Sequence, residues 1–215
     1  MNYSSMLTQM LAGSVVTLQV FAVTLLFSIP LGFVLMLAYV SNNPVLKRIT
    51  GFYILLMRGT PLLLQMFFVC YGLPFIPVIG KYLTFERFPA CSIAFVLNYS
   101  AYFAEIFRGG LLAVDKGQFE AAKVLGLTKS QTFVKIVIPQ MVRVSLPAIS
   151  NETIILVKDT ALVTAIAMQD LLHVTKNIVS RTANIMPYLA AAVFYLLMSY
   201  VLTLLFRHLE KKYAF

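Results

Sequence analysis

Five long apolar stretches, separated by shorter segments that hold most of the charged residues, organise this 215-residue chain. They cover residues 14–40, about 52–79, about 88–107, about 142–161 and 182–206. A helix needs ~20 apolar residues to cross a hydrocarbon layer ~30 Å thick, and each stretch meets that length. The fourth stretch contains Glu152, Lys158 and Asp159, so we expect a re-entrant or interfacial segment to follow it. The pattern predicts an all-α integral membrane protein with about five transmembrane helices.

The composition agrees with this prediction. Hydrophobic residues make up 60% of the chain and charged residues only 12%, whereas an ordinary soluble domain is ~25% charged. A soluble globular domain is therefore excluded. Five spans with short loops use nearly the whole length, so we expect one transmembrane domain over residues 1–215, with a core of about 14–208. No room is left for a separate ATPase or a soluble receptor module.

The net charge of +9 would also suit a nucleic-acid-binding protein, but the positions of the basic residues favour another explanation. Five spans place the two termini on opposite sides, and an excess of Lys and Arg marks the cytoplasmic side. With the N-terminus outside and the C-terminus cytoplasmic, the cytoplasmic segments hold twelve of the 17 basic residues: Lys47, Arg48, Arg58, Arg108, Lys116, Lys123, Lys129, Lys135, Arg143, Arg207, Lys211 and Lys212. Topology thus accounts for the charge, and we expect no nucleic-acid partner.

No motif for catalysis or metal binding is present in the sequence. It has no Gly-rich phosphate loop, no zinc-type Cys/His spacing and no Gly-x-Ser-x-Gly elbow. Cys70 and Cys91 fall inside predicted spans, where a small thiol usually serves packing. We therefore expect no enzyme activity, no metal site and no cofactor bound to this chain.

The longest segment on the predicted cytoplasmic side, about residues 113–139, reads as two short helices around Gly126. Thr128 followed by Gln131 has the spacing of a capping box, and Pro139 either ends the second helix or begins the next span. A short helix of this kind could sit in a groove of a soluble partner. The alternative is an amphipathic segment that touches lipid headgroups.

The spacing within this loop is Glu120-Ala121-Ala122, three residues, Gly126, nine residues, Ile136, one residue, and Ile138-Pro139. It resembles the EAA loop of the membrane subunits of bacterial ABC importers, which usually have Leu where this chain has Ile138. Two further stretches, Arg58-Gly59-Thr60-Pro61 and Lys158-Asp159-Thr160, are similar to those of the permeases for polar amino acids such as histidine, glutamine, arginine and cystine. The resemblance covers nearly the whole chain.

The resemblance implies a type I ABC importer permease in the bacterial inner membrane, which moves a polar amino acid but does not hydrolyse ATP itself. A separate ATP-binding subunit, an extracytoplasmic amino-acid-binding protein and a second permease subunit, identical or similar, would be its partners. The residues expected to couple the permease to the ATP-binding subunit are Glu120, Ala121, Ala122, Gly126 and Pro139.

Polar residues within the spans are candidates for the substrate pathway, because an ionisable group there costs ~2.5–3.5 kcal/mol on insertion scales. Asn98, Tyr102 and Glu105 follow one another at i, i+4 and i+7, so they share a helical face. Ser145, Glu152 and Asp159 are spaced by seven and also share a face. Two such stripes could line a central path.

Internal pairing is the alternative for the acidic residues. Glu105 precedes Arg108 by three positions, and we expect these two to pair. The basic residue nearest to Glu152 is Lys158, six positions on and on another face, so we expect Glu152 to line the path. A carboxylate there would favour a substrate with an additional positive charge or ammonium group, such as arginine, lysine, histidine or cystine.

Arg58, Thr60, Lys158 and Asp159 are expected to hold helix ends or to form gate contacts. A different functional class also remains open: a stand-alone channel or secondary transporter in which Glu105 and Glu152 couple to protons. Secondary transporters commonly need two repeats to build a site at the middle of the membrane, and this chain of five spans shows no internal repeat.

Overall fold

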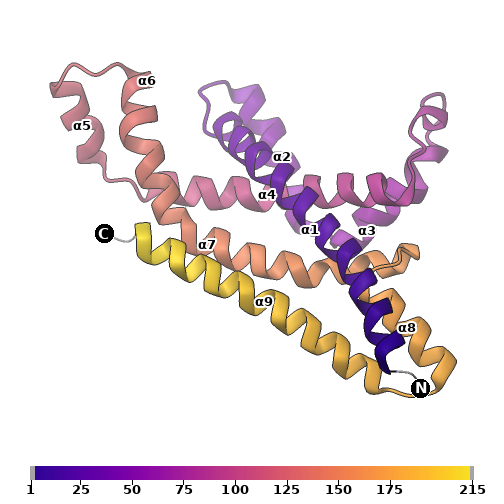
Figure 1. Cartoon of the computed structure of the whole chain (residues 1–215). Coiled ribbons are helices and arrows are strands. Elements are labelled where there is room, and N and C mark those ends of the chain that lie inside the picture. Colours follow the sequence, from indigo (N-terminus) through magenta and orange to yellow (C-terminus); the bar gives the residue numbers. More distant parts are fainter. Residues whose placement is uncertain (1–2, 214–215) are drawn as a thin grey trace.

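The computed structural model describes residues 3–213, and these residues form helices and connecting turns with no strand (Figure 1). The α-helices are α1 Tyr3–Tyr39, α2 Pro44–Gly59, α3 Leu62–Phe67, α4 Arg87–Leu112, α5 Lys116–Val124, α6 Lys129–Thr132, α7 Ile138–Asp159, α8 Leu171–Thr182 and α9 Met186–Tyr213. Two π-helical segments, Phe68–Gly72 and Phe133–Val137, and three 3-10 segments, Leu73–Phe75, Gly80–Tyr82 and Thr160–Ile166, connect some of them.

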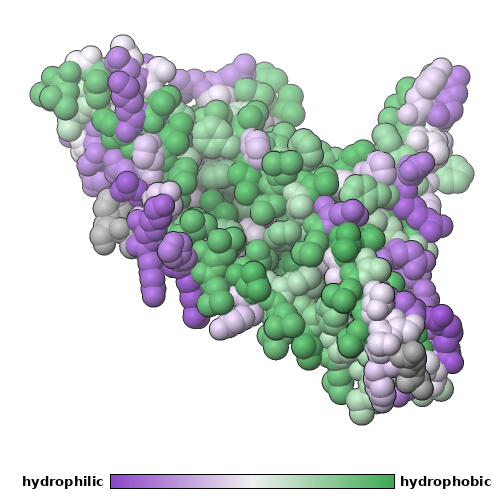
Figure 2. Space-filling model, in the orientation of Figure 1, coloured by the Kyte–Doolittle hydropathy of each residue, from purple (hydrophilic) through white to green (hydrophobic). Residues whose placement is uncertain are grey.

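Four helical stretches within the described part are long and apolar enough to cross a membrane: α1, α4, the continuous stretch Lys129–Ile166 and α9. The bent pair of α2 with the segment Leu62–Phe75 makes a fifth. Hydrophobic residues cover the middle of the molecule, and hydrophilic residues gather toward its two ends (Figure 2). The prediction of an all-α protein with about five spans is therefore confirmed.

The second span differs from the continuous helix that we predicted over about residues 52–79. Its first half begins earlier, at Pro44, and at Thr60 the chain turns by 106° into α3. Pro61 explains the break, because proline has no N–H for the carbonyl four residues before it and disfavours helical geometry in the residue that it follows. Thr60 accordingly has extended backbone angles. Arg58 lies at this break, and its guanidinium lies over the ring of Tyr102 on α4.

The first and last spans differ from prediction at their boundaries. Helix α1 starts by Tyr3, eleven residues before the predicted span, because Met6 and Met10 pack against Leu171 of α8 and Ala191 of α9. Residue 182, predicted to begin the last span, instead ends α8. The left-handed residue Ala183 separates α8 from α9, which extends beyond the predicted end to Tyr213.

The chain after Asp159 is irregular, as the charges in this span predicted. It tightens into the 3-10 segment Thr160–Ile166, reverses at the left-handed residue Ala167, and then enters α8. Asp170 caps α8 by accepting hydrogen bonds from the backbone N–H groups of Leu172 and His173. With twelve residues, α8 is about 18 Å long, too short to cross a hydrocarbon layer of ~30 Å.

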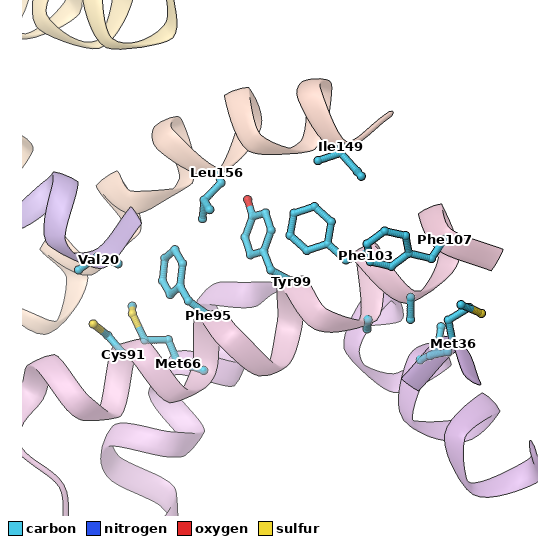
Figure 3. Close-up of a cluster of buried hydrophobic side chains, with 14 of the residues drawn as sticks. Val20, Met36, Met66, Cys91, Phe95, Tyr99, Phe103, Phe107, Ile149 and Leu156 are labelled. Carbon is cyan, nitrogen blue, oxygen red and sulfur yellow. The ribbon is translucent and has the colours of Figure 1, made fainter. Parts of the chain in front are cut away.

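The core is built on one face of α4. Phe95, Tyr99, Phe103 and Phe107 recur every four residues there and form a row of rings against α1 and α7 (Figure 3). Neighbouring rings in the row from Phe95 to Phe103 have centroids 6.4 Å apart. Helix α4 is thus the central helix, and it packs against α1, α2, α3 and α7. Its side chains are therefore held at fixed positions relative to these helices.

Glycines allow the closest helix contacts, as is usual where lipid-exposed helices pack. A Cβ atom at Gly32 of α1 would lie 2.7 Å from the Cβ of Phe103 on α4. At Gly110, near the end of α4, a Cβ would overlap the Ser145 hydroxyl and lie 2.8 Å from the carbonyl oxygen of Met141 on α7. The adjacent Gly109 has open space around the equivalent position.

These two neighbouring glycines give a matched test of the α4–α7 contact. We expect Gly110→Ala to lower the free energy of unfolding by about 1–3 kcal/mol, since the backbone of α7 must shift to admit the methyl group. Gly109→Ala should leave stability unchanged or raise it by up to about 1 kcal/mol through helix propensity. Thermal unfolding in detergent, followed by circular dichroism, measures both variants. Equal melting temperatures would contradict the close approach.

Candidate functional site

An open cleft of about 660 Å³ lies where the break between α2 and α3 faces α4 and α7. Its lining comes from all four helices and from the 3-10 segment after α7: Arg58, Gly59, Thr60, Pro61, Leu62, Leu63, Asn98, Tyr99, Tyr102, Glu152, Ile155, Asp159 and Leu162. A cleft with one guanidinium, two carboxylates and two phenols, set among spans that are otherwise apolar, is the principal candidate for a site that handles a small charged molecule.

The break itself is held together by side-chain amides. In a continuous helix the carbonyl of Met57 would accept a hydrogen bond from residue 61, but Pro61 has no N–H. Gln65 Nε2 and Asn98 Nδ2 donate to this carbonyl instead, each at 2.9 Å. Asn98 also donates to Gln65 Oε1 at 3.0 Å. Asn98, predicted as a pathway residue, therefore lies at the cleft with its amide engaged in supporting the break.

Arg58 extends from the break toward α4. Its guanidinium lies over the ring of Tyr102, 5.4 Å from the centroid, and 3.7 Å from Glu105 Oε2. Glu105 is bound more closely by Arg108, whose Nη2 donates to Oε2 at 2.8 Å and whose Nε lies 3.1 Å from Oε1. The expected pairing of Glu105 with Arg108 is thus present, and Glu105 is not among the residues that line the cleft.

Two carboxylates face the cleft from α7. Asp159 accepts a hydrogen bond of 2.8 Å from the hydroxyl of Tyr99, which belongs to the aromatic row of α4 (Figure 3). Glu152 is half-buried, and within the described residues it has no ion pair closer than 4.0 Å. The third member of the predicted stripe, Ser145, is buried against α4 and donates to the Ile106 carbonyl. The structure therefore places Glu152 and Asp159 in one cleft and Ser145 outside it.

The remaining predicted gate residues differ in their surroundings. The Thr60 hydroxyl donates to the Leu56 carbonyl at 2.8 Å and receives a hydrogen bond of 2.7 Å from Gln65 Nε2. Thr60 thus helps to close the end of α2. Lys158 is exposed and does not line the cleft, although the next residue, Asp159, does.

Gln65 and Tyr99 are the residues of this site that sequence reasoning missed. Gln65 stands in an apolar run, whereas Tyr99 stands between Asn98 and Ser100, and each contacts a residue outside its own helix. One signal was available for Gln65. It is the single amide side chain in an otherwise apolar stretch of residues 61–70, and it stands four residues after Pro61. A proline at that position leaves a backbone carbonyl unpaired, and a nearby amide can pair with it. No comparable signal pointed to the contact between Tyr99 and Asp159.

A second candidate surface is the projecting end formed by α5 and α6 (Figure 1). The two predicted helices are present, and Thr128 and Gln131 form the predicted capping box. Gly126 has φ of +72°, the left-handed conformation that ends α5. Pro139 stands in the first turn of α7, directly after the π-helical segment and inside the continuous helical stretch Lys129–Ile166.

The surface of this end is exposed and partly apolar. Glu120 and Ala121 are exposed, while Ala122 is buried and its carbonyl accepts a hydrogen bond from the N–H of Leu127. Val124, the last residue of α5, is 87% exposed, and Leu125, the C-cap, is 75% exposed, although both side chains are apolar. A groove of about 550 Å³ between α5 and α6 is lined by Phe119, Lys123, Leu127, Lys129, Thr132 and Phe133. Such a surface suits contact with another protein.

Relatives of known name resemble the chain over almost its whole length. The L-cystine transport system permease protein of Bacillus subtilis is 34% identical over 202 residues, which is 93% of this chain and 84% of that protein. The octopine transport system permease protein of Rhizobium radiobacter is 36% identical over 208 residues, 94% of this chain and 84% of that protein.

A solved structure, described as an amino acid ABC transporter with histidines, contains a chain that superimposes on this one with a TM-score of 0.88. The two chains are 31% identical, and the superposition covers 99% of each. The family described as binding-protein-dependent transport system inner membrane component matches residues 28–215. The chain belongs to this family of inner-membrane transport components, as the spacing of its EAA loop predicted.

Proposed function

We propose that the chain is the permease subunit of an ATP-driven importer, and that a polar amino acid crosses through the cleft between the α2–α3 break and α7. The observation that carries this proposal is the cleft itself, which places Arg58, Glu152 and Asp159 together between membrane-spanning helices. The names of its relatives, permeases for cystine and octopine, and its likeness to a chain of an amino acid transporter support the substrate class.

The charges of the cleft match those of an amino acid. Arg58 can bind the substrate carboxylate, because its contact with Glu105 is long at 3.7 Å and Arg108 already neutralises that glutamate. The α-ammonium group can bind to Asp159, which leaves Glu152 for a positive charge on the substrate side chain. With two carboxylates facing one guanidinium, the cleft can accept a further positive charge on the substrate, which supports arginine, lysine, histidine or cystine over neutral amino acids.

The proposed partner at the α5–α6 end is the ATP-binding subunit. Helix α5 presents Glu120 and Ala121 on its exposed side, and Gly126 and Pro139 fix where α5 ends and where α7 begins. The apolar residues Val124 and Leu125 would be covered in a groove of that subunit, which binds and hydrolyses the ATP. No step of ATP chemistry needs a residue of this chain.

The proposed orientation places this end in the cytoplasm. The α5–α6 end, the turn between α1 and α2 and the end of α9 lie toward one side of the molecule, and α8 lies toward the other (Figure 1). The first side carries most of the basic residues, as expected of a cytoplasmic surface. The start of α1 would then face the outside, where a binding protein delivers the amino acid.

A second permease subunit completes the proposed assembly. The cleft is not enclosed in a single chain, so a bound amino acid would remain partly exposed. An identical or similar permease packed against this opening would enclose the path between two polar stripes. The alternative, a stand-alone proton-coupled transporter, loses support because Glu105 is paired with two arginines. Transport of amino acids by the chain reconstituted alone would restore it.

The role of Glu152 can be tested with Glu152→Gln. We expect the KM for uptake of L-arginine to rise about tenfold or more, since a charge-assisted hydrogen bond contributes ~1.5–3 kcal/mol, while the KM for L-glutamine changes little. Uptake into proteoliposomes that contain the complete transporter measures both. The control is Glu86→Gln, the same change at an exposed residue before α4. An unchanged preference between the two amino acids would remove the argument for Glu152.

The role of the α5–α6 end can be tested at Gly126. A β-branched residue is strained at a φ of +72°, whereas asparagine tolerates it, and nothing lies within 4 Å of the Cβ position. We expect Gly126→Val to reduce ATP-dependent uptake severalfold, with normal membrane insertion, and Gly126→Asn to retain most of it. Uptake and ATPase rates of the reconstituted complex are the measurements. Loss of insertion in Gly126→Val would make the loop merely structural.

A further inference from the structure

One side chain bridges the two ends of the segment that carries Arg58. Gln65 Nε2 lies 2.9 Å from the carbonyl oxygen of Met57, the residue before Arg58. The same nitrogen lies 3.1 Å from the carbonyl oxygen and 2.7 Å from the hydroxyl of Thr60, two residues after Arg58. Because the Thr60 hydroxyl donates its own proton to Leu56, it accepts from Gln65. Arg58 and Gly59 are therefore held between two points fixed by one amide.

The side chain of Arg58 has little else to fix it. It is 43% exposed, and its Nη1 lies 3.7 Å from Glu105 Oε2. Its guanidinium carbon lies over the face of the Tyr102 ring, 5.4 Å from the centroid. Gly59 next to it has nothing within 4 Å of its Cβ position, so no packing restrains the backbone there. The position of the guanidinium at the cleft thus depends on where the backbone of the break is held.

Gln65 is in turn held from α4. Asn98 Nδ2 donates both to Gln65 Oε1 at 3.0 Å and to the Met57 carbonyl at 2.9 Å. Asn98 is 4% exposed and lies on the central helix α4, one residue before Tyr99, whose ring belongs to the aromatic row (Figure 3). A chain of amides therefore connects the rigid face of α4 to the segment that carries Arg58.

We propose that Gln65, supported by Asn98, is a positioning residue that sets the place of the Arg58 guanidinium and thereby the affinity of the cleft for the substrate carboxylate. This inference rests on the proposed function, in which the cleft binds the amino acid. Gln65 does not line the cleft, so it acts through Arg58 rather than on the substrate. A merely structural Gln65 would stabilise the break without affecting how Arg58 binds.

A double-mutant cycle separates these roles. The variants are Gln65→Met, which keeps the side-chain length and removes both donors, Arg58→Gln, and the two combined, each in the complete transporter purified in detergent. Equilibrium binding of L-arginine to these complexes gives the Kd. The control is Gln19→Met, the same change at an exposed position of α1; it should not alter the Kd.

We expect Gln65→Met to raise the Kd about tenfold when Arg58 is present and less than about twofold in the Arg58→Gln background. The melting temperature should fall by the same amount in both backgrounds. An equal rise in Kd in both backgrounds, or no rise in either, overturns the positioning role alone. An unchanged Kd in Arg58→Gln by itself overturns the proposed binding cleft and this inference with it.

If Gln65→Met does not yield folded protein, Asn98→Ala tests the same chain of amides. This change removes one of the two donors to Met57 and leaves the contacts between Gln65 and Thr60 in place. The expected rise in Kd is smaller, about threefold, and should again disappear in the Arg58→Gln background. A rise that persists there would show that Asn98 acts on the cleft without Arg58, and it would overturn the positioning role.

Discussion

The carbonyl of Met57 is the group on which the arrangement of the cleft depends. Pro61 leaves it without a helical partner, and an unpaired carbonyl between membrane-spanning helices is costly because no water is available to satisfy it. Two amides, from Gln65 and Asn98, replace the missing donor. The break is therefore stable only where α3 folds back against α4. The same requirement brings Arg58, Tyr102 and the carboxylates of α7 to one place.

Charge balance is the second constraint on this region. A guanidinium between apolar helices needs nearby negative charge, and Arg58 has Glu105 on one side and the carboxylates of the cleft on the other. Glu105 is shared with Arg108, which binds it more closely. Arg58 is consequently stabilised without being fully neutralised. In the proposed function, this incomplete pairing leaves its guanidinium able to bind the carboxylate of an amino acid.

Sequence patterns predicted the features that lie within one helix. The apolar stretches gave the spans, Thr128 with Gln131 gave a cap, and the spacing of Glu105 and Arg108 gave an ion pair, because each depends on neighbours along the chain. The break at Pro61 was readable in principle, but the apolar run that continues past it favoured a single span. Contacts such as that of Tyr99 with Asp159 join residues 60 positions apart on different helices, and no periodicity within one helix relates them.

Helix α7 connects the two candidate surfaces. Helix α6, the π-helical segment and α7 run without interruption from Lys129, beside the projecting end, to Asp159 in the cleft. At Gly110, α7 approaches α4 so closely that no methyl group fits between them. In the proposed function, a displacement of the α5–α6 end turns α7 about this close contact with α4, and Glu152 and Asp159 move with it. Arg58 lies on α2, which the amides of Gln65 and Asn98 hold against α4, so the distances between opposite charges in the cleft change. By this route ATP binding in the partner subunit would alter the affinity of the cleft for an amino acid.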